Sequence, residues 1–552
     1  MSTRGRRALE VPLPESKFVL QDDSAGTFVL NFSDHPEALR AVRLSLYSAP
    51  MVLKEEPSVF IIGVGGGNDV WAAKHGGARL VKGVELNEPI LDIHREVLPR
   101  YSRVLLEDST IELVTAEGRS FLIREREGYN VIQMTGIDTW TALASGAHVL
   151  AENYLYTSEA IQDAYARLRP EGILHIVRFA ATMESLRLLA NVDHALTVVG
   201  AGDIRDSVIC LATWDQLFSV ILKKGRFTDR EIDRIEAFAR AAVIRPVYVP
   251  GRTSLSRSDP VHYFLATEDR QGFIRSFPRD ISPTTDDRPY FFNYSKWSRP
   301  FESAKSAGAH TAVSQGNPFL LLTQLLLISL LAVGLIVAPL VATERRRFDR
   351  RHAPRFFVYF LGLGVGFIGI EIALMQKLTL FLVHPLYSIT VTLFCILVFA
   401  GVGSLVSARW FETTRNREWF VPAGIALTVV LFVIAAPSIV RAAIGLPLAA
   451  RVVVSAAMLA SIAFLLGVPL AYGIRLLNQM NRSLIPWGLG GQRLLHGRGL
   501  PRGRHPVDER RLQRRPHRRG RRLRRLLRGS TRPGDVSQTP RLEAAIGPDE
   551  NA

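Results

Sequence analysis

Three glycines and one acid have the types and spacing of a nucleoside-binding site. Gly63, Gly65 and Gly67 directly follow a run of four apolar residues, and Glu85 comes about 20 residues later. Glycines let the backbone turn tightly and approach a ligand without intervening side chains. A carboxylate at this distance can accept hydrogen bonds from ribose hydroxyls. The pattern therefore predicts a site for a nucleoside.

The flanking segments are of the kind needed to position such a site. Residues 59–62 predict a strand buried on both faces, because the apolar run is continuous. Residues 70–75 predict the start of a helix whose free N–H groups face the ligand. Residues 80–86 predict a second strand, which ends near the acid. The final glycine of the dinucleotide fingerprint is missing, so the spacing favours an S-adenosylmethionine-type ligand over NAD.

Strands and helices alternate along the first part of the chain. Further strands are expected at 28–32, 111–114, 129–134, 173–177, 207–212 and 245–250, and helices at 35–48, 89–98, 158–168, 183–196 and 229–242. This alternation predicts a Rossmann-like α/β fold with a mostly parallel sheet. Ligands of such sheets bind beyond the carboxyl ends of the strands, where Glu85, Glu117 and Asp138 all fall.

A series of motifs resembles the spermidine synthases, the polyamine aminopropyltransferases. The motifs are Ile-Gly-x-Gly-Gly-Gly at 62–67, Val-Glu-Leu-Asn at 84–87, Glu-Gly-Arg at 117–119, Tyr-Asn-Val-Ile at 129–132 and Leu-Arg-Pro-Glu-Gly-Ile-Leu at 168–174. The chain is most similar to bacterial membrane-embedded relatives, in which such a domain is fused to transporter-like helices. Segments typical of those relatives are 138–140, 144–147, 152–157, 371–377 and 384–388.

The resemblance implies a ligand and a role for each residue. The co-substrate would be S-adenosylmethionine or decarboxylated S-adenosylmethionine, and an aminopropyl or methyl group would pass to an amine. Gly63, Gly65 and Gly67 would line the methionine end of the ligand. Glu85 would hold the ribose, and Glu117 would contact the adenine amine.

The loop proposed to supply the catalytic base departs from the family pattern. Thr135 replaces the first aspartate of the Asp-x-x-Asp motif, which leaves Asp138 as the catalytic candidate. The acid of the family's glycine turn is also displaced, with Gly66 in its place and Asp69 further on. A threonine hydroxyl is too weak a base at neutral pH. Either positioning supplies most of the rate, or the domain is a nucleoside or polyamine sensor without turnover.

An acid and two tyrosines after this loop have the composition of an amine pocket. Glu152, Tyr154 and Tyr156 could bind a cation through charge pairing and cation–π contact. The alternative is that the tyrosines pack against a helix end while the acid is solvated. Two cysteines in 552 residues allow no metal knuckle, and we expect no metal.

The second half of the chain has the composition of a membrane protein. Five apolar segments are long enough to span a bilayer, at 319–341, 356–375, 386–408, 420–440 and 452–474. Glycines at 362, 364, 366 and 369 predict close helix packing. Glu371 is an acid within a span, which indicates either a polar pathway or a hydrogen-bonded helix contact.

Three regions follow, namely a soluble domain at 1–316, a transmembrane region at 317–487 and a basic tail at 488–552. The net charge of +17 is concentrated in membrane-flanking loops and in the tail, so no nucleic-acid surface is expected. The tail is expected to be disordered. It is either an arm for anionic lipids or the product of a shifted reading frame.

The expected location is a bacterial-type inner membrane, with the lipid bilayer as a partner. Arginines after the first and third spans favour cytoplasmic loops, which would place the soluble domain outside. Sulfonium donors are made and kept in the cytoplasm, however, and a large domain weighs little in the charge rule. We therefore expect a cytoplasmic domain.

Overall fold

The structure, a computed structural model, describes residues 14–21, 25–137, 152–180, 182–214, 217–296, 298, 318–338, 353–382, 385–413 and 419–480. Asp138, the boundary expected near residue 316 and the tail at 488–552 lie outside these residues.

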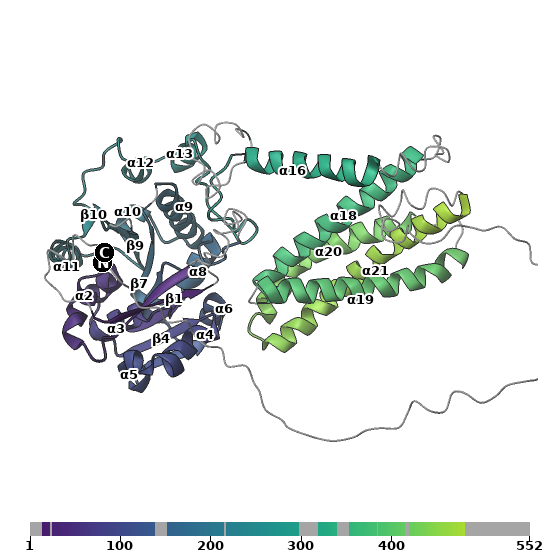
Figure 1. Cartoon of the computed structure of the whole chain (residues 1–552). Coiled ribbons are helices and arrows are strands. Elements are labelled where there is room, and N and C mark those ends of the chain that lie inside the picture. The colour runs from purple at the N-terminus through teal and green to yellow at the C-terminus, as the bar shows by residue number, and fades with distance from the viewer. Residues whose placement is uncertain are drawn as a thin grey trace, which may run out of the picture. The chain divides into compact units, whose positions relative to one another are not determined.

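In the described part of the chain, eight strands form one sheet in the order β10-β8-β9-β7-β6-β3-β4-β5 (Figure 1). The strands are β3 (Ser58–Ile62), β4 (Leu80–Glu85), β5 (Ile111–Thr115), β6 (Tyr129–Thr135), β7 (Leu168–Phe179), β8 (Val208–Ala212), β9 (Leu217–Lys223) and β10 (Arg245–Tyr248). Strands β3 to β7 pair in parallel. Only the β9 and β10 pairings among these strands are antiparallel. The expected mostly parallel, Rossmann-like sheet is confirmed.

The strand order reverses at β3, which lies between β4 and β6. A reversal of this kind opens a crevice beyond the carboxyl ends of the strands, where ligands bind in open α/β sheets. Strand β9 is inserted between β7 and β8 and runs antiparallel to both. The dinucleotide-binding order 3-2-1-4-5-6 has no such insertion.

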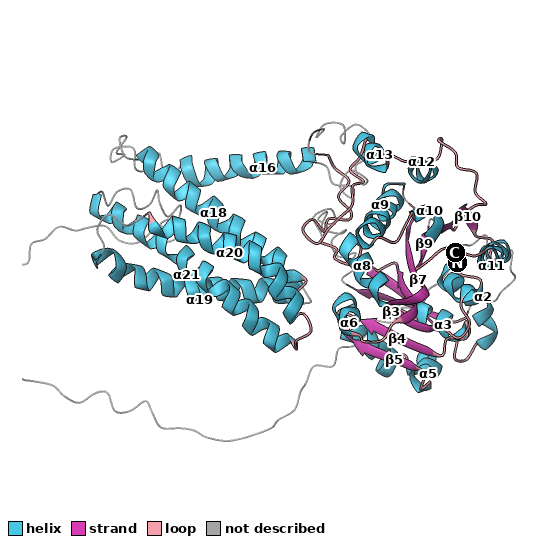
Figure 2. Ribbon diagram, turned by 180° about the vertical axis from the view of Figure 1, so that it is seen from behind, coloured by secondary structure: helices cyan, strands magenta, loops and turns pink. Residues whose placement is uncertain are grey.

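Helices cover both faces of the sheet (Figure 2). Phe60 and Ile62 of β3 pack in the same core as α6 (Gly118–Arg124), α8 (Ser158–Arg167) and α9 (Thr182–Val199). Val59 and Ile61 pack with α2 (Leu39–Arg43), α3 (Asn68–His75) and α5 (Pro99–Glu107). Burial on both faces explains the continuous apolar run of this strand. The remaining helices of the domain are η1 (Pro36–Ala38), η2 (Leu46–Leu53), α4 (Glu88–Asp92), η3 (Ile93–Val97), α10 (Ile204–Ser207), α11 (Asp229–Ala241), α12 (Pro260–Ala266) and α13 (Arg270–Ser276).

The single helix expected at 35–48 is wrong. Three short pieces, η1, α2 and η2, occupy this segment and the residues after it. Pro36 begins η1 and Pro50 lies within η2. Pro36 stands at the first position of its helix, where proline is tolerated, and Pro50 lies beyond the expected helix. The expected helix is interrupted at Ser45, whose backbone is extended (φ −102°, ψ 162°).

A hairpin of β1 (Ser16–Gln21) and β2 (Ala25–Leu30) precedes the main sheet. The sequence predicted only a strand at 28–32, and β1 was missed. Phe18 and Phe28 pack against each other with ring centroids 4.6 Å apart.

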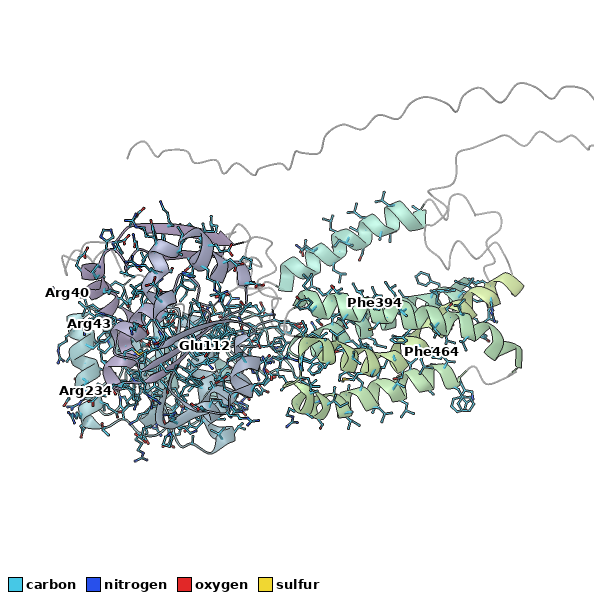
Figure 3. The ribbon with its side chains drawn as sticks, turned by 90° about the horizontal axis from the view of Figure 1, so that it is seen from below. Arg40, Arg43, Glu112, Arg234, Phe394 and Phe464 are labelled. Carbon is cyan, nitrogen blue, oxygen red and sulfur yellow. The ribbon has the colours of Figure 1, made fainter. Side chains whose placement is uncertain are left out.

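Four helices in the described residues are long and apolar enough to cross a membrane. They belong to α18 (Ala353–Thr379), α19 (Pro385–Thr413), α20 (Phe420–Ala443) and α21 (Leu448–Met480). The first expected span is represented by the shorter apolar helix α16 (Pro318–Ala332), which continues as η5 (Val333–Val337), and its last residues lie outside the described part. Phe394 of α19 projects outward and is 66% exposed, as suits a lipid-facing side chain (Figure 3).

The prediction of close packing at the glycines of α18 is wrong for the described residues. A Cβ atom added at Gly362, or at the glycines at 364, 366 and 369, would meet nothing within 4 Å. The close contact instead joins α19 and α21. A Cβ atom at Gly403 would lie 1.9 Å from the carbonyl oxygen of Phe464, and one at Gly467 would lie 1.9 Å from that of Ala400. The two backbones therefore touch directly.

Candidate functional site

The glycine turn between β3 and α3 lies at the reversal point of the sheet. The φ values are 82° at Gly63, 50° at Gly65 and 81° at Gly67. Residues other than glycine rarely adopt such values. Gly66 is required for a different reason, because an added Cβ atom would lie 2.0 Å from the carbonyl oxygen of Phe28. The hairpin therefore packs on the turn so closely that only a bare backbone fits.

Glu85 ties the turn to the end of β4. Its side chain is almost fully buried, and one carboxylate oxygen accepts a hydrogen bond from the N–H of Gly65 at 3.0 Å. The other oxygen accepts one from the N–H of Asn87 at 3.1 Å. A carboxylate offers about four acceptor positions, so both oxygens retain capacity for ribose hydroxyls.

His94 supports the same turn from the other side, a role that the sequence analysis missed. Its Nε2 lies 2.8 Å from the carbonyl oxygen of Gly65, and its Nδ1 lies 2.6 Å from the Oγ of Ser102. Burial lowers the pKa of the ring, so the neutral form donates from Nε2 and accepts from the serine hydroxyl. Gly65 is thus held at both its N–H and its carbonyl group.

Thr27 of the hairpin is a second supporting residue that was missed. Its Oγ1 accepts a hydrogen bond from the N–H of Gly66 at 2.9 Å. The two groups are far apart in sequence, and no local pattern indicates the contact.

Glu117 lies at the same edge of the sheet, immediately before α6. It caps that helix, accepting hydrogen bonds from the N–H of Arg119 at 3.0 Å and of Ser120 at 2.6 Å. The neighbouring Gly118 presses against the end of β3, since an added Cβ atom would lie 2.4 Å from Ile62. The structure therefore brings Glu117 to the strand that leads into the glycine turn. Its contact with an adenine amine stays a prediction.

The three candidates for an amine pocket occupy two different environments. The hydroxyl of Tyr154 donates to Glu152 at 2.9 Å, and burial raises the pKa of this glutamate. Tyr156 is fully buried, and its hydroxyl donates to the carbonyl oxygen of Ile137 at 3.0 Å. Ile137 in turn lies against Gly63, 3.0 Å from the position of an added Cβ atom. Tyr156 thus supports the chain above the turn, and substrate binding by the three residues stays a prediction.

A buried acid, Asp69, lies beside the end of β6. It is fully buried in the first turn of α3 and accepts hydrogen bonds from Gln133 and, at 2.7 Å, from the hydroxyl of Thr135. Burial raises its pKa to about 7, against the opposing effect of these hydrogen bonds. The sequence marked Asp69 only as a displaced family acid. The polar Gln133, between the apolar Ile132 and Met134, was the signal that a partner had to exist.

A strap from Asp280 to Tyr294 closes the domain and is fixed by buried polar side chains. Arg187 donates to the carbonyl oxygens of Phe291 at 2.9 Å and Asn293 at 2.6 Å. Arg119 forms a two-pronged ion pair with Asp286 at 2.7 and 2.8 Å. Since Arg119 follows the Glu117 cap, the strap is anchored directly to the candidate site.

No protein-family model matches the chain, and no curated protein matches it. Solved structures with a similar fold include a spermidine synthase in complex with the transition-state analogue AdoDATO. The two sequences are 17% identical, the match covers 39% of this chain and 71% of that chain, and the TM-score is 0.28. The spermidine synthase from Thermotoga maritima has 16% identity, with 45% and 84% covered and a TM-score of 0.31. Human methyltransferase-like protein 13 in complex with SAH has 15% identity, with 41% and 98% covered and a TM-score of 0.27. At these values the likeness assigns no activity to this chain.

Proposed function

We propose that this chain is a membrane-anchored transferase that binds S-adenosylmethionine or its decarboxylated form. It would transfer an aminopropyl or methyl group from the sulfonium centre to an amine. The observation that carries the proposal is the link between Glu85 and Gly65 at the reversal point of the sheet. It combines a ribose acceptor with a backbone that a ligand can approach closely.

The free acceptor capacity at this edge supports an adenosyl ligand. Glu85 uses one hydrogen bond on each oxygen for the backbone, which leaves room for two ribose hydroxyls. The Oε1 atom of Glu117 accepts one hydrogen bond, from Arg119, so it can also accept one from an adenine amine. The antiparallel β9 and the glycine spacing both argue against a dinucleotide ligand.

The helical region supports anchoring in a bilayer. Each of the four candidate spans is at least 22 residues long, against about 20 needed to cross the hydrocarbon core. The donor would be met on the cytoplasmic side of a bacterial-type inner membrane, where sulfonium compounds are made.

A nucleoside or polyamine sensor without turnover is the second candidate. Thr135 at the end of β6 favours it, because the aspartate that is proposed as the base in the soluble spermidine synthases is replaced there. Both candidate functions require the ligand to bind, and they differ in whether the bound ligand then reacts.

The decisive experiment incubates the purified full chain with each isotopically labelled sulfonium donor and a panel of amines. Mass spectrometry should find the label on an amine, together with the matching thioether product. Binding of a donor by calorimetry without any labelled product would favour the sensor. Absence of both binding and transfer would overturn the proposed function.

A further inference from the structure

The carboxyl group of Asp69 lies beside Thr135, although the family motif does not link these two positions. The Oδ1 atom of Asp69 is 2.7 Å from the Oγ1 atom of Thr135, which is the last residue of β6. Strand β6 pairs with β3 at the point where the strand order reverses. Asp69 belongs to the first turn of α3, directly after the glycine turn. The carboxyl group is therefore buried directly behind the glycine turn, against the end of β6, the strand next to β3.

A second buried polar group marks the same place. Gln133 is fully buried, and its Nε2 donates to Asp69 and, at 3.0 Å, to the carbonyl oxygen of Tyr47. Its Oε1 atom has no hydrogen-bond partner among the described residues. A buried acceptor without a donor costs free energy, so a donor that reached this oxygen would be stabilised beside Asp69.

The groups that shift the pKa of Asp69 are all uncharged. Burial raises its pKa to about 7, while the hydrogen bonds from Thr135, Gln133 and its own N–H group lower it. No charged group among the described residues contributes to this shift. A carboxyl group in such a position changes its charge near neutral pH, which is the range in which a general base works best.

We propose that Asp69 is the proton acceptor of this site, and that Thr135 and Gln133 are positioning residues that hold its carboxylate. The inference rests on the proposed function and names the residue that replaces the missing base. An ammonium group of the acceptor loses one proton to the Asp69 carboxylate and becomes a neutral amine. The nitrogen lone pair then attacks the carbon bonded to sulfur, and the C–S electron pair leaves with sulfur as a thioether. The product is a secondary ammonium ion, and Asp69 releases its proton to solvent.

The test compares transfer and donor binding in the full chain. Asp69→Asn keeps an oxygen that can accept from Thr135 but cannot take up a proton. It should lower kcat/KM at pH 7 by at least ~100-fold, in the range of general-base contributions, while the Kd for the donor stays within about threefold. The matched control is Asp233→Asn, because this acid of α11 is exposed and pairs only with Arg252 in the described residues. It should leave both quantities unchanged.

A second variant covers the case in which Asp69→Asn fails to fold. Thr135→Val removes the hydroxyl that stabilises the charged carboxylate, so the rising limb of the pH–rate profile should move to higher pH. Thr135→Ser should restore it. A merely structural contact would not move the pH profile in this way.

Thr135→Asp gives opposite outcomes for two explanations of the site. If Asp69 is the base, a second carboxyl beside it raises one pKa strongly and should lower the rate at pH 7. If the site simply lacks an acid, the same change should raise the rate. A raised rate, or an Asp69→Asn variant as active as wild type, would overturn the inference while leaving the proposed function intact. Wild-type protein that binds the donor but transfers nothing would overturn the inference and leave donor binding intact. Wild-type protein that neither binds nor transfers would overturn both.

Discussion

Glu85 and Asp69 are two buried acids at the same edge of one sheet, and their partners differ in kind. Glu85 accepts from two backbone N–H groups, those of Gly65 and Asn87. Asp69 accepts from the side chains of Gln133 and Thr135, besides its own N–H group. Backbone donors are fixed by the fold, so they hold the carboxyl group of Glu85 in one orientation. Burial outweighs these hydrogen bonds and raises the pKa of Asp69 to about 7, so this acid can change its protonation near neutral pH.

The largest expected effect concerns the pH dependence of stability. The pKa of Asp69 is raised from 3.8 to about 7 in the folded chain, so the folded state binds more protons than the unfolded state between these values. The contribution of Asp69 is therefore fully present below about pH 4 and is lost as the pH rises through about 7, on the order of 4 kcal/mol in total. Asp69→Asn should remove this slope in denaturation of the detergent-solubilised chain. Equal slopes in wild type and variant would contradict the raised pKa of Asp69.

The next effect concerns ligand affinity. If Glu85 holds the ribose as proposed, Glu85→Ala removes charge-assisted hydrogen bonds to it and should weaken donor binding by about 1–3 kcal/mol. Calorimetry measures the change, with Glu88→Ala as the control because Glu88 is exposed in the next helix. Unchanged affinity in Glu85→Ala would remove the ribose assignment.

A smaller loss is expected from His94→Leu. The leucine fills a similar volume but leaves the carbonyl oxygen of Gly65 and the hydroxyl of Ser102 without their partner. The free energy of unfolding should fall by about 1–2 kcal/mol, and donor affinity should fall with it because the turn is less well held. His94→Gln, which can donate and accept, should recover part of the loss, and failure to do so would argue that only the ring shape matters.

The smallest effect should come from Thr27→Val, which removes the acceptor for the N–H of Gly66. We expect a loss of about 1 kcal/mol in stability, with Thr27→Ser close to wild type. A larger loss in Thr27→Val than in His94→Leu would show that the hairpin, rather than the histidine, determines the shape of the turn.

Sequence reasoning found the elements whose signals are local. The apolar run at 59–62, the glycines after it and Glu85 lie within one strand–helix–strand unit, so their arrangement follows from short-range rules. Strand β9 was missed although Leu217–Lys223 is a local apolar run, and only its position between β7 and β8 depends on long-range pairing. Contacts such as Thr27 with Gly66 and Asp69 with Thr135 join residues 39 and 66 positions apart. No periodicity connects such pairs, although an acid and a glutamine in buried positions signalled that partners were required.

The glycine contact between α19 and α21 has a mechanical consequence. Because backbone meets backbone at Gly403 and Gly467, no side chain at the contact can change rotamer to absorb a small displacement. The two helices can slide or tilt against each other only by separating along the whole contact. Any rearrangement of the bundle should therefore move α19 and α21 together as one rigid unit.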